Sequence, residues 1–393
     1  MKVMSINARN SSIHFTLYEM DPESVLAEGV FDRIGMDGSN TLIKYRNNRI
    51  TQEIALESYQ DAVRLLLEKL IDLRILSSLD EIRGVGHRIV QGIDHYQSSM
   101  IVTDELLQEL EEMKDFAPLH TSGELKCVKA FREALGETPM VLVFDSAFHQ
   151  TMIPSTYLYP VPYEWYEKYG VRKYGFHGTS HRYIAEYVSE ILGRDSFKLI
   201  SCHLGEGASI CAIRDMKCVD TSMGFTPLSG IMMNTRSGDV DPSIIPYVME
   251  KEGKNASEVV DDLNKVSGLL GISEYSNSMN DILARSDEGD EKALLAKEMY
   301  IQRIVDYIAK YYVLLGGVNA LAFTADIGEN CVPIRREICE RLACLGVKID
   351  LDQNNIKGEF VNISTNDSSF DVFVIPNHEE LMIARDTYNL INR

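Results

Sequence analysis

Residues 197–213 read Phe-Lys-Leu-Ile-Ser-Cys-His-Leu-Gly-Glu-Gly-Ala-Ser-Ile-Cys-Ala-Ile, and the fold prediction for the whole chain begins here. Phe197–Cys202 and Ile210–Ile213 are apolar runs typical of β-strands, and Gly205 and Gly207 lie in the turn between them. Two glycines that flank one residue between apolar runs predict a tight hairpin turn. Because glycine lets a backbone approach a ligand closely, the N–H groups of such a turn can also bind an anion. A plain surface hairpin explains the same residues equally well.

The first residues of the chain follow the same strand–turn–strand plan. Val3–Ile6 and Ile13–Tyr18 are apolar runs, and the polar residues Asn7–Ser12 separate them. A strand–turn–strand unit that opens each half of a chain predicts a duplicated fold with a ligand between the halves. Two short segments are weak support by themselves, because β-hairpins are common.

Alternating strand-like and helix-like segments place the chain in the α/β class. Pro139–Phe144 is a β-like run followed by Asp145, and ligands bind at the carboxyl ends of strands in open α/β sheets. An aromatic and proline-rich composition between Phe148 and Tyr174 predicts a domain boundary. The other predicted elements are strands at 82–85, 320–324 and 371–375 and helices at 58–76, 104–113, 122–135, 291–315, 333–345 and 379–391.

Composition excludes several classes of protein. The 393 residues suffice for two domains, and a net charge of −20 makes a nucleic-acid backbone an unsuitable partner. Seven cysteines without a Cys-x-x-Cys pair indicate neither a disulfide framework nor a zinc site. The first residues lack the apolar region of a signal peptide, and the most apolar window, Val313–Ala325, is too short to span a membrane. We therefore expect a cytoplasmic protein without a membrane partner or a nucleic-acid partner.

A second motif, Met233–Asp239 (MNTRSGD), places an arginine among small hydroxyl residues and glycine. Arg236 in this setting suits bidentate binding of a phosphate or a carboxylate. Asp241 before Pro242 predicts that a helix starts there, because these are favoured N-cap and N1 residues. A capped helix with one surface arginine explains the same pattern.

Further basic and acidic residues stand in turn-like positions or after predicted strands. The basic residues in turn-like positions are Arg88, His120 and His177. The acidic residues that follow predicted strands are Asp145 and Glu379. Positive groups around a few carboxylates describe a phosphoryl-transfer site, where positioning and charge neutralisation provide most of the catalysis. The carboxylates would hold Mg²⁺ directly or through water. Each residue alone also suits a structural role, since a single histidine near a strand end is more often a hydrogen-bonding partner.

The tract Tyr169–His181 (YGVRKYGFHGTSH) runs without interruption into a predicted helix that Thr179 or Ser180 would cap. With this tract the sequence resembles the acetate kinase family of acyl-phosphate-forming kinases, and the resemblance spans nearly the whole chain. Further matches to the family's motifs, in chain order, are Gly86–Val90, Ala117–His120, Phe144–Met152, His203–Gly205, Asp220–Leu228, Thr235–Asp239, Ser267–Ser273, Ile327–Asn330 and Glu379–Asp386. So many ordered matches are highly specific.

The resemblance implies the duplicated actin-like ATPase (ribonuclease H-like) fold, with two lobes and a cleft between them. It assigns residues 1–147 and the C-terminal helix 381–393 to one lobe and residues 148–380 to the other. The implied reaction is in-line attack of acetate on the terminal phosphate of ATP, which gives acetyl phosphate and ADP with Mg²⁺ as cofactor. The resemblance also implies a homodimer.

The same resemblance implies a role for individual residues. The implied catalytic residues are Arg88, His120, Asp145, His177 and Arg236, and the implied acetate-binding residues are Arg88, Val90, Phe176 and Pro227. Asn7 and Glu379 would bind the metal ion. The implied nucleotide and phosphate contacts are Asn10, Ser12, His14, His203, Gly205, Glu206, Gly207, Ser278, Asn280, Asp326, Gly328 and Asn330.

The sequence departs from the family pattern mainly in the loops on the nucleotide side. Arg9 and His14 replace a glycine and a lysine of the first hairpin, and Glu206 replaces the asparagine between the two glycines of the second. Asn280 stands where the family has arginine, and Asp326 stands where it has glycine. Aspartate can adopt a positive φ angle, but at residue 326 it adds bulk and charge where the family has glycine.

Three functions fit these observations. The first is an acetate kinase that still binds ATP or ADP, and the second is an acyl kinase with another phosphoryl donor, such as pyrophosphate. The third is a catalytically weak relative that binds an acyl phosphate or a partner. Glu206 discriminates among them: a side chain that faces the nucleotide phosphates favours the second and third, and one paired with a surface lysine or arginine favours the first.

Overall fold

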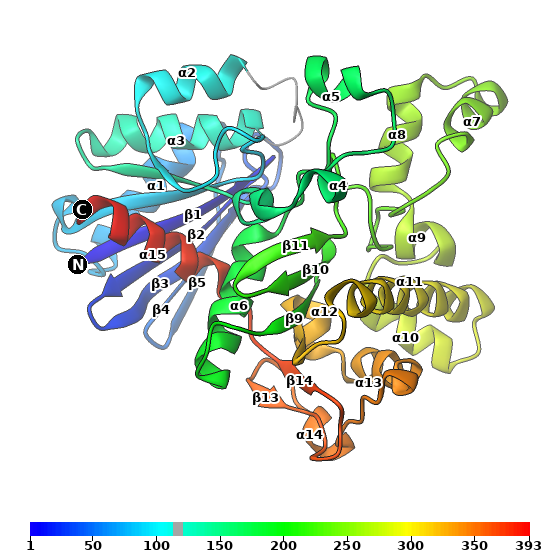
Figure 1. Cartoon of the computed structure of the whole chain (residues 1–393). Helices are drawn as coiled ribbons and strands as arrows, with labels where there is room; N and C mark the ends of the chain where they lie inside the picture. Colours follow the sequence, from blue (N-terminus) through cyan, green and yellow to red (C-terminus); the bar gives the residue numbers. More distant parts are fainter. Residues whose placement is uncertain (113–120) are drawn as a thin grey trace. The chain divides into compact units, whose positions relative to one another are not determined.

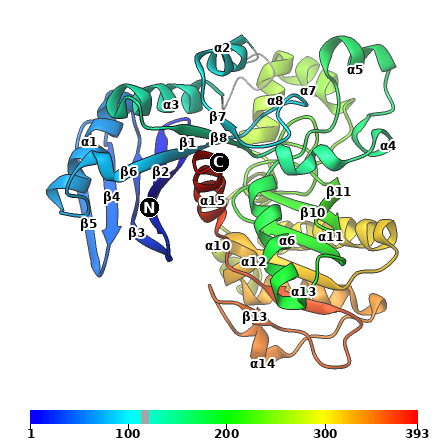
Figure 2. The same ribbon diagram turned by 60° about the vertical axis from the view of Figure 1, so that its left-hand side comes forward.

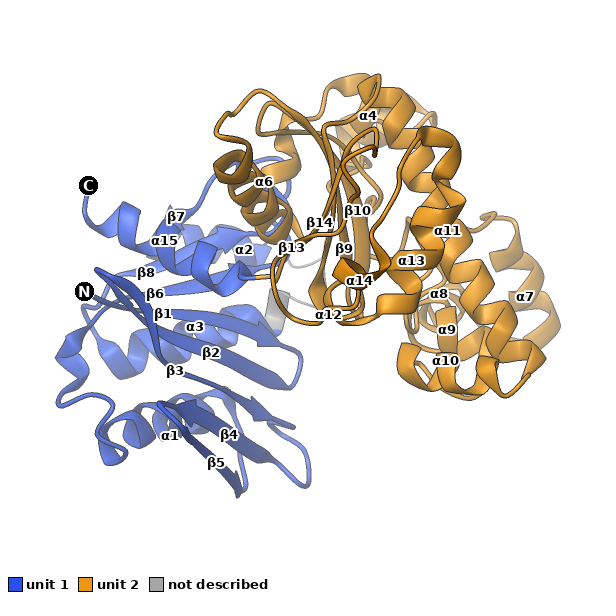
Figure 3. Ribbon diagram, turned by 90° about the horizontal axis from the view of Figure 1, so that it is seen from below, with its two compact units in different colours: residues 1–147, 378–393 blue, residues 148–377 orange. Residues whose placement is uncertain are grey.

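A computed structural model describes residues 1–112 and 121–393 of the chain. The chain divides into two compact units, Met1–Ala147 with His378–Arg393, and Phe148–Asn377 (Figure 3). The sequence placed the second lobe boundary at residue 380; the last segment of the first unit begins at His378, and its helix begins at Glu379.

The first unit is built on a mixed sheet with the strand order β5-β4-β3-β2-β1-β6-β8-β7. β1 pairs antiparallel with β2 and parallel with β6, and β6 pairs parallel with β8. The strands are β1 (Lys2–Arg9), β2 (Ser12–Met20), β3 (Glu23–Asp32), β4 (Asn40–Tyr45), β5 (Asn48–Glu53), β6 (Ile82–Ile89), β7 (Met100–Ile101) and β8 (Met140–Phe144). The predicted strand at 82–85 is therefore longer than expected and carries Arg88 near its carboxyl end.

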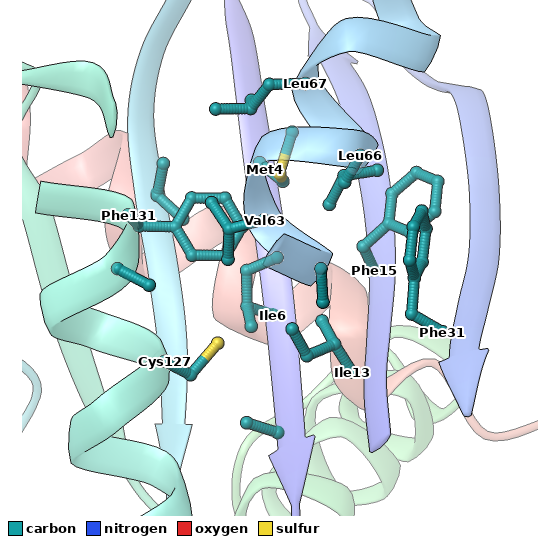
Figure 4. Close-up of a cluster of buried hydrophobic side chains, with 14 of the residues drawn as sticks. Met4, Ile6, Ile13, Phe15, Phe31, Val63, Leu66, Leu67, Cys127 and Phe131 are labelled. Carbon is teal, nitrogen blue, oxygen red and sulfur yellow. The ribbon is translucent and has the colours of Figure 1, made fainter. Parts of the chain in front are cut away.

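Helices cover both faces of this sheet, because successive side chains of a strand point to opposite faces (Figures 1 and 4). Met4 and Ile6 of β1 pack with Phe131 of α3 on one face. Val3 packs with Ala384 of α15 on the other face. The helices are α1 (Tyr59–Asp72), η1 (Leu79–Glu81), α2 (Asp104–Glu112), α3 (Thr121–Leu135) and α15 (Glu379–Ile391).

Glycines of β6 let α15 lie close to the sheet. A Cβ atom at Gly86 would lie 2.2 Å from Thr387 Oγ1 and 2.7 Å from Ile383 Cγ2. No side chain fits in that space, so the glycine is required by helix–sheet packing.

The second unit carries a mixed sheet with the order β11-β10-β9-β12-β14-β13. β9 pairs antiparallel with β10 and parallel with β12, which pairs parallel with β14. The strands are β9 (Lys198–Leu204), β10 (Ala208–Arg214), β11 (Lys217–Thr221), β12 (Ala320–Thr324), β13 (Val361–Asn362) and β14 (Asp371–Val374). The order β3-β2-β1-β6-β8 in the first unit therefore recurs as β11-β10-β9-β12-β14. This repeat, with two parallel strands beside an antiparallel hairpin, confirms the duplicated actin-like fold.

Helices also cover both faces of the second sheet, with α6 on one face and α11 and α13 on the other (Figures 2 and 3). The helices of the first half of this unit are η3 (Ala147–Thr151), which spans the unit boundary, α4 (Pro154–Tyr157), α5 (Tyr163–Tyr169), α6 (Gly178–Leu192) and α7 (Ile244–Glu252). The remaining helices are α8 (Ala256–Lys265), α9 (Gly268–Ser273), α10 (Met279–Asp287), α11 (Glu291–Leu315), α12 (Ala325–Asn330), α13 (Val332–Arg341), η4 (Ala343–Leu345) and α14 (Leu351–Asn354).

Two predicted helix starts are wrong. The helix predicted at Asp241-Pro242 begins at Ile244, because the Asp241 carboxylate accepts a hydrogen bond from Ser243 N at 2.8 Å and forms a turn before the helix. Helix α6 is not capped by Thr179 or Ser180 but follows His177 at the N-cap, and both predicted caps are buried in its first turn.

Within the described residues, no helix combines the length and the apolar composition of a membrane span.

Candidate active site

The first unit brings three of the predicted site residues together at the carboxyl ends of its parallel strands. Arg88 Nη2 donates a 2.6 Å hydrogen bond to Asp145 Oδ2, and Arg88 Nη1 lies 3.3 Å from Asn7 Oδ1. The strand register produces this arrangement, since Ile6 of β1 is opposite His87 of β6. Asp145 is fully buried, so its carboxylate depends on the arginine for charge compensation.

Glu379 lies at the start of α15 and shares this environment. Burial, and then the neighbouring Glu380, raise the pKa of Glu379 to about 7, although the Arg88 charge opposes the shift. A partly buried carboxylate whose ionisation is this unfavourable would be stabilised by an additional cation. Together with Asn7 and Asp145 it offers the oxygen ligands that Mg²⁺ prefers, so these residues fit that ion.

Glu124 of α3 contacts a predicted site residue and was not recognised from the sequence. Its carboxyl oxygens accept the Val90 N–H at 3.2 and 3.3 Å, and Val90 is a predicted acetate-binding residue. Burial raises the pKa of Glu124 to about 8, although the Arg88 charge and the Val90 N–H both oppose the shift. Protonated Glu124 therefore positions the backbone directly after β6 without adding a negative charge beside Arg88.

The first hairpin carries three predicted phosphate contacts with different exposure. Asn10 is exposed at the turn, Ser12 is buried, and His14 is half-buried opposite Asn7 on the neighbouring strand. Burial, and then the Arg9 charge, lower the pKa of His14 to about 4. His14 is therefore neutral near pH 7 and does not replace the positive charge of the family's lysine. His120 lies outside the described residues.

In the second unit, the β9–β10 hairpin predicted around Gly205–Gly207 is confirmed, and its turn lies against predicted catalytic side chains. A Cβ atom at Gly207 would lie 3.3 Å from Arg236 Nη1 and 3.4 Å from His177 Nε2. A Cβ atom at Gly205 would lie 3.7 Å from His203 Nε2. The arginine and the two histidines thus converge on a glycine turn, which is the arrangement expected for binding of an anionic group.

A hydrogen-bonded chain of side chains holds His177 in place. His177 Nδ1 lies 2.9 Å from Ser209 Oγ, which lies 2.8 Å from His181 Nε2. His181 Nδ1 in turn lies 2.9 Å from Ser201 Oγ. Burial lowers the pKa of His181 well below its ordinary value, so its ring is neutral. The His203 ring stacks on the His177 ring with centroids 4.2 Å apart.

The backbone of His177 is held in an uncommon conformation. Its φ angle is 58°, in the left-handed region that L-residues rarely occupy, and no side chain caps the helix that follows. Ser180, one of the predicted caps, instead bonds through Oγ to His203 Nδ1 at 2.8 Å. Strained backbone of this kind clusters at active sites, where the surrounding contacts maintain it.

Arg236 is positioned by backbone contacts of its loop. Its Nη1 lies 3.4 Å from the carbonyl oxygen of Pro227, so these two predicted residues are neighbours. Gly268 adopts a φ of +61°, and a Cβ atom there would lie 2.1 Å from Met233 O and 2.8 Å from Arg236 O. Phe176 is buried directly before His177.

Five predicted nucleotide contacts line one cavity of about 280 Å³ in the second unit. They are Glu206, Ser278, Asn280, Asp326 and Asn330. The Oδ1 atom of Asn234, a further lining residue, is buried and has no hydrogen-bond partner among the described residues. An unsatisfied buried acceptor at a cavity wall is explained by a ligand that donates to it.

Glu206 lines this cavity and forms no ion pair with a lysine or arginine of the described residues. Asp326 is exposed on the same cavity and accepts a hydrogen bond from Asn330 Nδ2 at 3.1 Å. The cavity therefore carries two acidic groups and no basic side chain among its lining residues. Repulsion of nucleotide phosphates by these groups would be partly screened, because the site is open to water.

Asp326 does not occupy a position of positive φ. The left-handed residue is Ala325, with φ of 63°, whereas Asp326 is part of helix α12. Parallel pairing of Thr324 with His203 brings Ala325 beside the hairpin, and a Cβ atom at Gly205 would lie 3.5 Å from its Cβ. The aspartate therefore adds charge to the cavity without straining the backbone.

Arg335 holds the backbone next to two residues that line the cavity, Ile327 and Asn330, and was not recognised from the sequence. Its side chain is fully buried, and its Nη1 donates to the carbonyls of Gly328 and Glu329 at 2.9 and 2.7 Å. Nη2 and Nε donate to the backbone and side chain of Asn354 at 2.7 and 2.9 Å. The planar guanidinium thus ties the motif Ile327–Asn330, which is part of α12, to Asn354 of α14.

Comparisons with known proteins identify the family of the chain. Residues 2–385 match the model of the acetokinase family. The chain is 48% identical over 393 residues to an acetate kinase of Bacillus cytotoxicus, covering 100% of this chain and 99% of that protein.

Solved structures of acetate and propionate kinases have the same fold as this chain. The acetate kinase of Porphyromonas gingivalis matches with a TM-score of 0.94 and 39% identity over 99% of both chains. A propionate kinase of Francisella tularensis matches with the same TM-score of 0.94 and 36% identity, also over 99% of both chains. The chain therefore belongs to the acetokinase family.

Proposed function

We propose that the chain is a Mg²⁺-dependent acetate kinase that transfers the terminal phosphoryl group of ATP reversibly to acetate, giving acetyl phosphate and ADP. The observation that carries this proposal is the convergence of Arg236 and His177 on Gly207, in a chain of a family whose members transfer phosphate to a carboxyl acceptor. The full-length identity with acetate kinases supports the substrate.

The proposed reaction needs one bond to form and one to break. An acetate carboxylate oxygen attacks the terminal phosphorus, and the bond from that phosphorus to the bridging oxygen of ADP breaks. Arg88 would bind the acetate carboxylate, and Val90, Phe176 and Pro227 would surround its methyl group. Arg236 and the His177 ring would offset the charge that spreads over the transferring phosphoryl oxygens.

Asn7 and Glu379, with Asp145, would hold Mg²⁺. When bound, this ion neutralises negative charge on the phosphate oxygens. Arg88 keeps the oxygens of Asn7 and Asp145 directed toward one place, so that these groups are oriented in advance. His120 would assist, as the family resemblance implies.

The nucleotide would occupy the cavity lined by Glu206, Ser278, Asn280, Asp326 and Asn330. Its two acidic groups predict a modest nucleotide affinity. Taken alone, Glu206 favours a donor other than ATP or a catalytically weak relative, but the identity with acetate kinases over the full length does not favour these alternatives. We also propose, on the resemblance alone, a cytoplasmic homodimer.

Acyl-phosphate formation, trapped as the hydroxamate, tests the proposal. Purified protein with Mg²⁺ and acetate is offered ATP, GTP or pyrophosphate in parallel. We expect product with ATP. Arg236→Ala should lower the rate of product formation by several orders of magnitude. Arg303→Ala, which removes an exposed arginine of the same unit, should leave that rate unchanged.

Product with pyrophosphate alone would replace ATP as the donor in this proposal. A folded protein that forms no product with any donor would instead be a binding protein. An equal loss in Arg303→Ala would show that the effect of Arg236→Ala is not specific to the site.

A further inference from the structure

His149, Cys211 and Cys218 form a buried cluster in the second unit that has no role in the proposed reaction. His149 Nδ1 lies 3.2 Å from Cys218 Sγ, and Cys218 Sγ lies 3.5 Å from Cys211 Sγ. All three ligand atoms lie within 4.8 Å of one another. The histidine comes from η3 and the two cysteines come from the neighbouring strands β10 and β11, so only folding brings them together.

A second contact fixes the orientation of the histidine ring. His149 Nε2 lies 2.8 Å from the carbonyl oxygen of Phe176. Because a carbonyl only accepts, Nε2 carries the proton and the lone pair of Nδ1 points toward Cys218. Histidines that ligate metals are commonly held in this way, with the second ring nitrogen bonded to a backbone carbonyl. Gly175 leaves room for the ring, since a Cβ atom there would lie 2.8 Å from His149 Cγ.

We propose that His149 Nδ1 and the thiolates of Cys211 and Cys218 bind a thiophilic d¹⁰ metal ion, Zn²⁺ or Cu⁺. Two sulfur ligands and one imidazole are the donor set that these ions prefer, and tetrahedral or trigonal sites separate such atoms by about 3.5–4 Å. Two of the observed separations, 3.2 and 3.5 Å, are at or just below this range, and all three atoms lie within 4.8 Å of one another, so small shifts of the side chains would suffice.

Binding would release two protons, one from each thiol, because the ligands are thiolates. Both thiols are buried, and each would lose its proton as the positive ion approaches.

The spacing of the cysteines in the sequence could not indicate this site. Metal sites recognised from sequence have ligands in close pairs, whereas here a histidine and two cysteines come from three separate elements. The site is independent of the Mg²⁺ that the reaction would use, because its donors are nitrogen and sulfur rather than oxygen.

Metal uptake by the full chain tests the proposal. Cys344→Ser serves as the parent, because Cys344 is an exposed free thiol that would bind thiophilic ions nonspecifically. The reduced parent is exposed to Zn²⁺, to Cu⁺ or to Co²⁺ as a spectroscopic probe, and then dialysed. We expect about one retained ion per chain, with thiolate charge-transfer absorption for Co²⁺.

Cys218→Ala in the parent should lose the retained ion, whereas Cys202→Ala, at a buried cysteine of β9 outside the cluster, should keep it. X-ray absorption on the loaded parent, which needs no cluster variant, should show two sulfur ligands and one nitrogen ligand. Retention of Zn²⁺ or Cu⁺ identifies the ion.

A parent that retains no ion would overturn the proposal. It would also be overturned if Cys202→Ala lost as much metal as Cys218→Ala, or if oxygen ligands alone surrounded the ion.

Discussion

The Nδ1 atom of His177 lies 2.9 Å from the Oγ atom of Ser209, although the two residues belong to different elements, the start of α6 and the strand β10. Ser209 also contacts His181 Nε2 at 2.8 Å. One hydroxyl proton cannot be donated to both rings, so at least one histidine donates to Ser209. The tautomer of His177 is therefore linked, through Ser209, to the tautomer of the buried and neutral His181.

Ser209→Ala should lower kcat by about tenfold, or about 1.4 kcal/mol of transition-state stabilisation, with KM values for acetate and ATP nearly unchanged. The reason is that the His177 ring loses the contact that orients it. Steady-state kinetics measures this split. Ser201→Ala, which removes a contact only from His181, is the matched control and should have a smaller effect. An equal effect of both variants would show that the whole network is merely structural.

Replacement of both acidic groups of the nucleotide cavity, by Glu206→Gln with Asp326→Asn, should tighten ADP binding by about two- to tenfold. Removing two partly screened repulsions of roughly 0.5 kcal/mol each explains this range. Asparagine at residue 326 suits the helical backbone of α12, and its side-chain oxygen can still accept the hydrogen bond from Asn330 Nδ2. Calorimetry measures the affinity, and acetate KM should stay the same. Unchanged ADP affinity would mean that these side chains turn away from the bound nucleotide.

Protonation of Glu124 predicts a pH dependence of stability. The pKa is about 8 in the folded chain and 4.5 in the unfolded chain, so between these values only the folded chain keeps the proton. The contribution of Glu124 to the free energy of unfolding should therefore be fully present below about pH 4.5 and should decrease as the pH rises toward about 8.

Glu124→Gln, which cannot ionise, should reduce this decline by roughly 2–4 kcal/mol between about pH 5 and about pH 8. Denaturant unfolding at several pH values measures the free energy. Glu133→Gln, on the exposed side of the same helix, is the control and should keep the slope of the unchanged protein. A parallel decline in the Glu124→Gln variant would show that Glu124 is ionised in the folded chain.

Arg335→Lys should raise the KM for ATP several-fold and lower the melting temperature by several degrees, with acetate KM unchanged. Lysine lacks the planar fork that serves the carbonyls of Gly328 and Glu329 and the side chain of Asn354, so buried acceptors lose partners. Arg341→Lys, at a partly exposed ion pair of the same helix, should change neither value. If the KM for acetate rose as much as the KM for ATP, the substitution would disturb the whole site rather than only residues 327–330.

The sequence predicted the repeated plan and the elements with strong periodicity. The helix Glu291–Leu315 and the strand Ala320–Thr324 were predicted at their observed bounds. Asp290 caps that helix, and Gly316 ends it with φ of 65°, so local signals mark both ends. The strands β3–β5 were not predicted, because many of their residues are exposed and the apolar alternation is weak.

Within the site, the sequence predicted the charged groups but not what holds them. Glu124, Ser209 and Arg335 act on predicted site residues or on the nucleotide loop from other elements, so their roles depend on tertiary contacts that spacing does not reveal. His181 had a usable signal, since it follows His177 by four residues and therefore shares its side of a helix. The predicted caps of α6 failed because Ser180 is bonded to His203 instead.

The return of α15 to the first sheet has a consequence for how the protein is made. The helix that covers Gly86 is synthesised only after the entire second unit, so the first unit has one face of its sheet uncovered while the second unit is being made. The second unit is contiguous and can complete its fold earlier. Glu379 arrives on the same late helix, and a prematurely terminated chain therefore lacks both the cover of the first sheet and a proposed metal ligand.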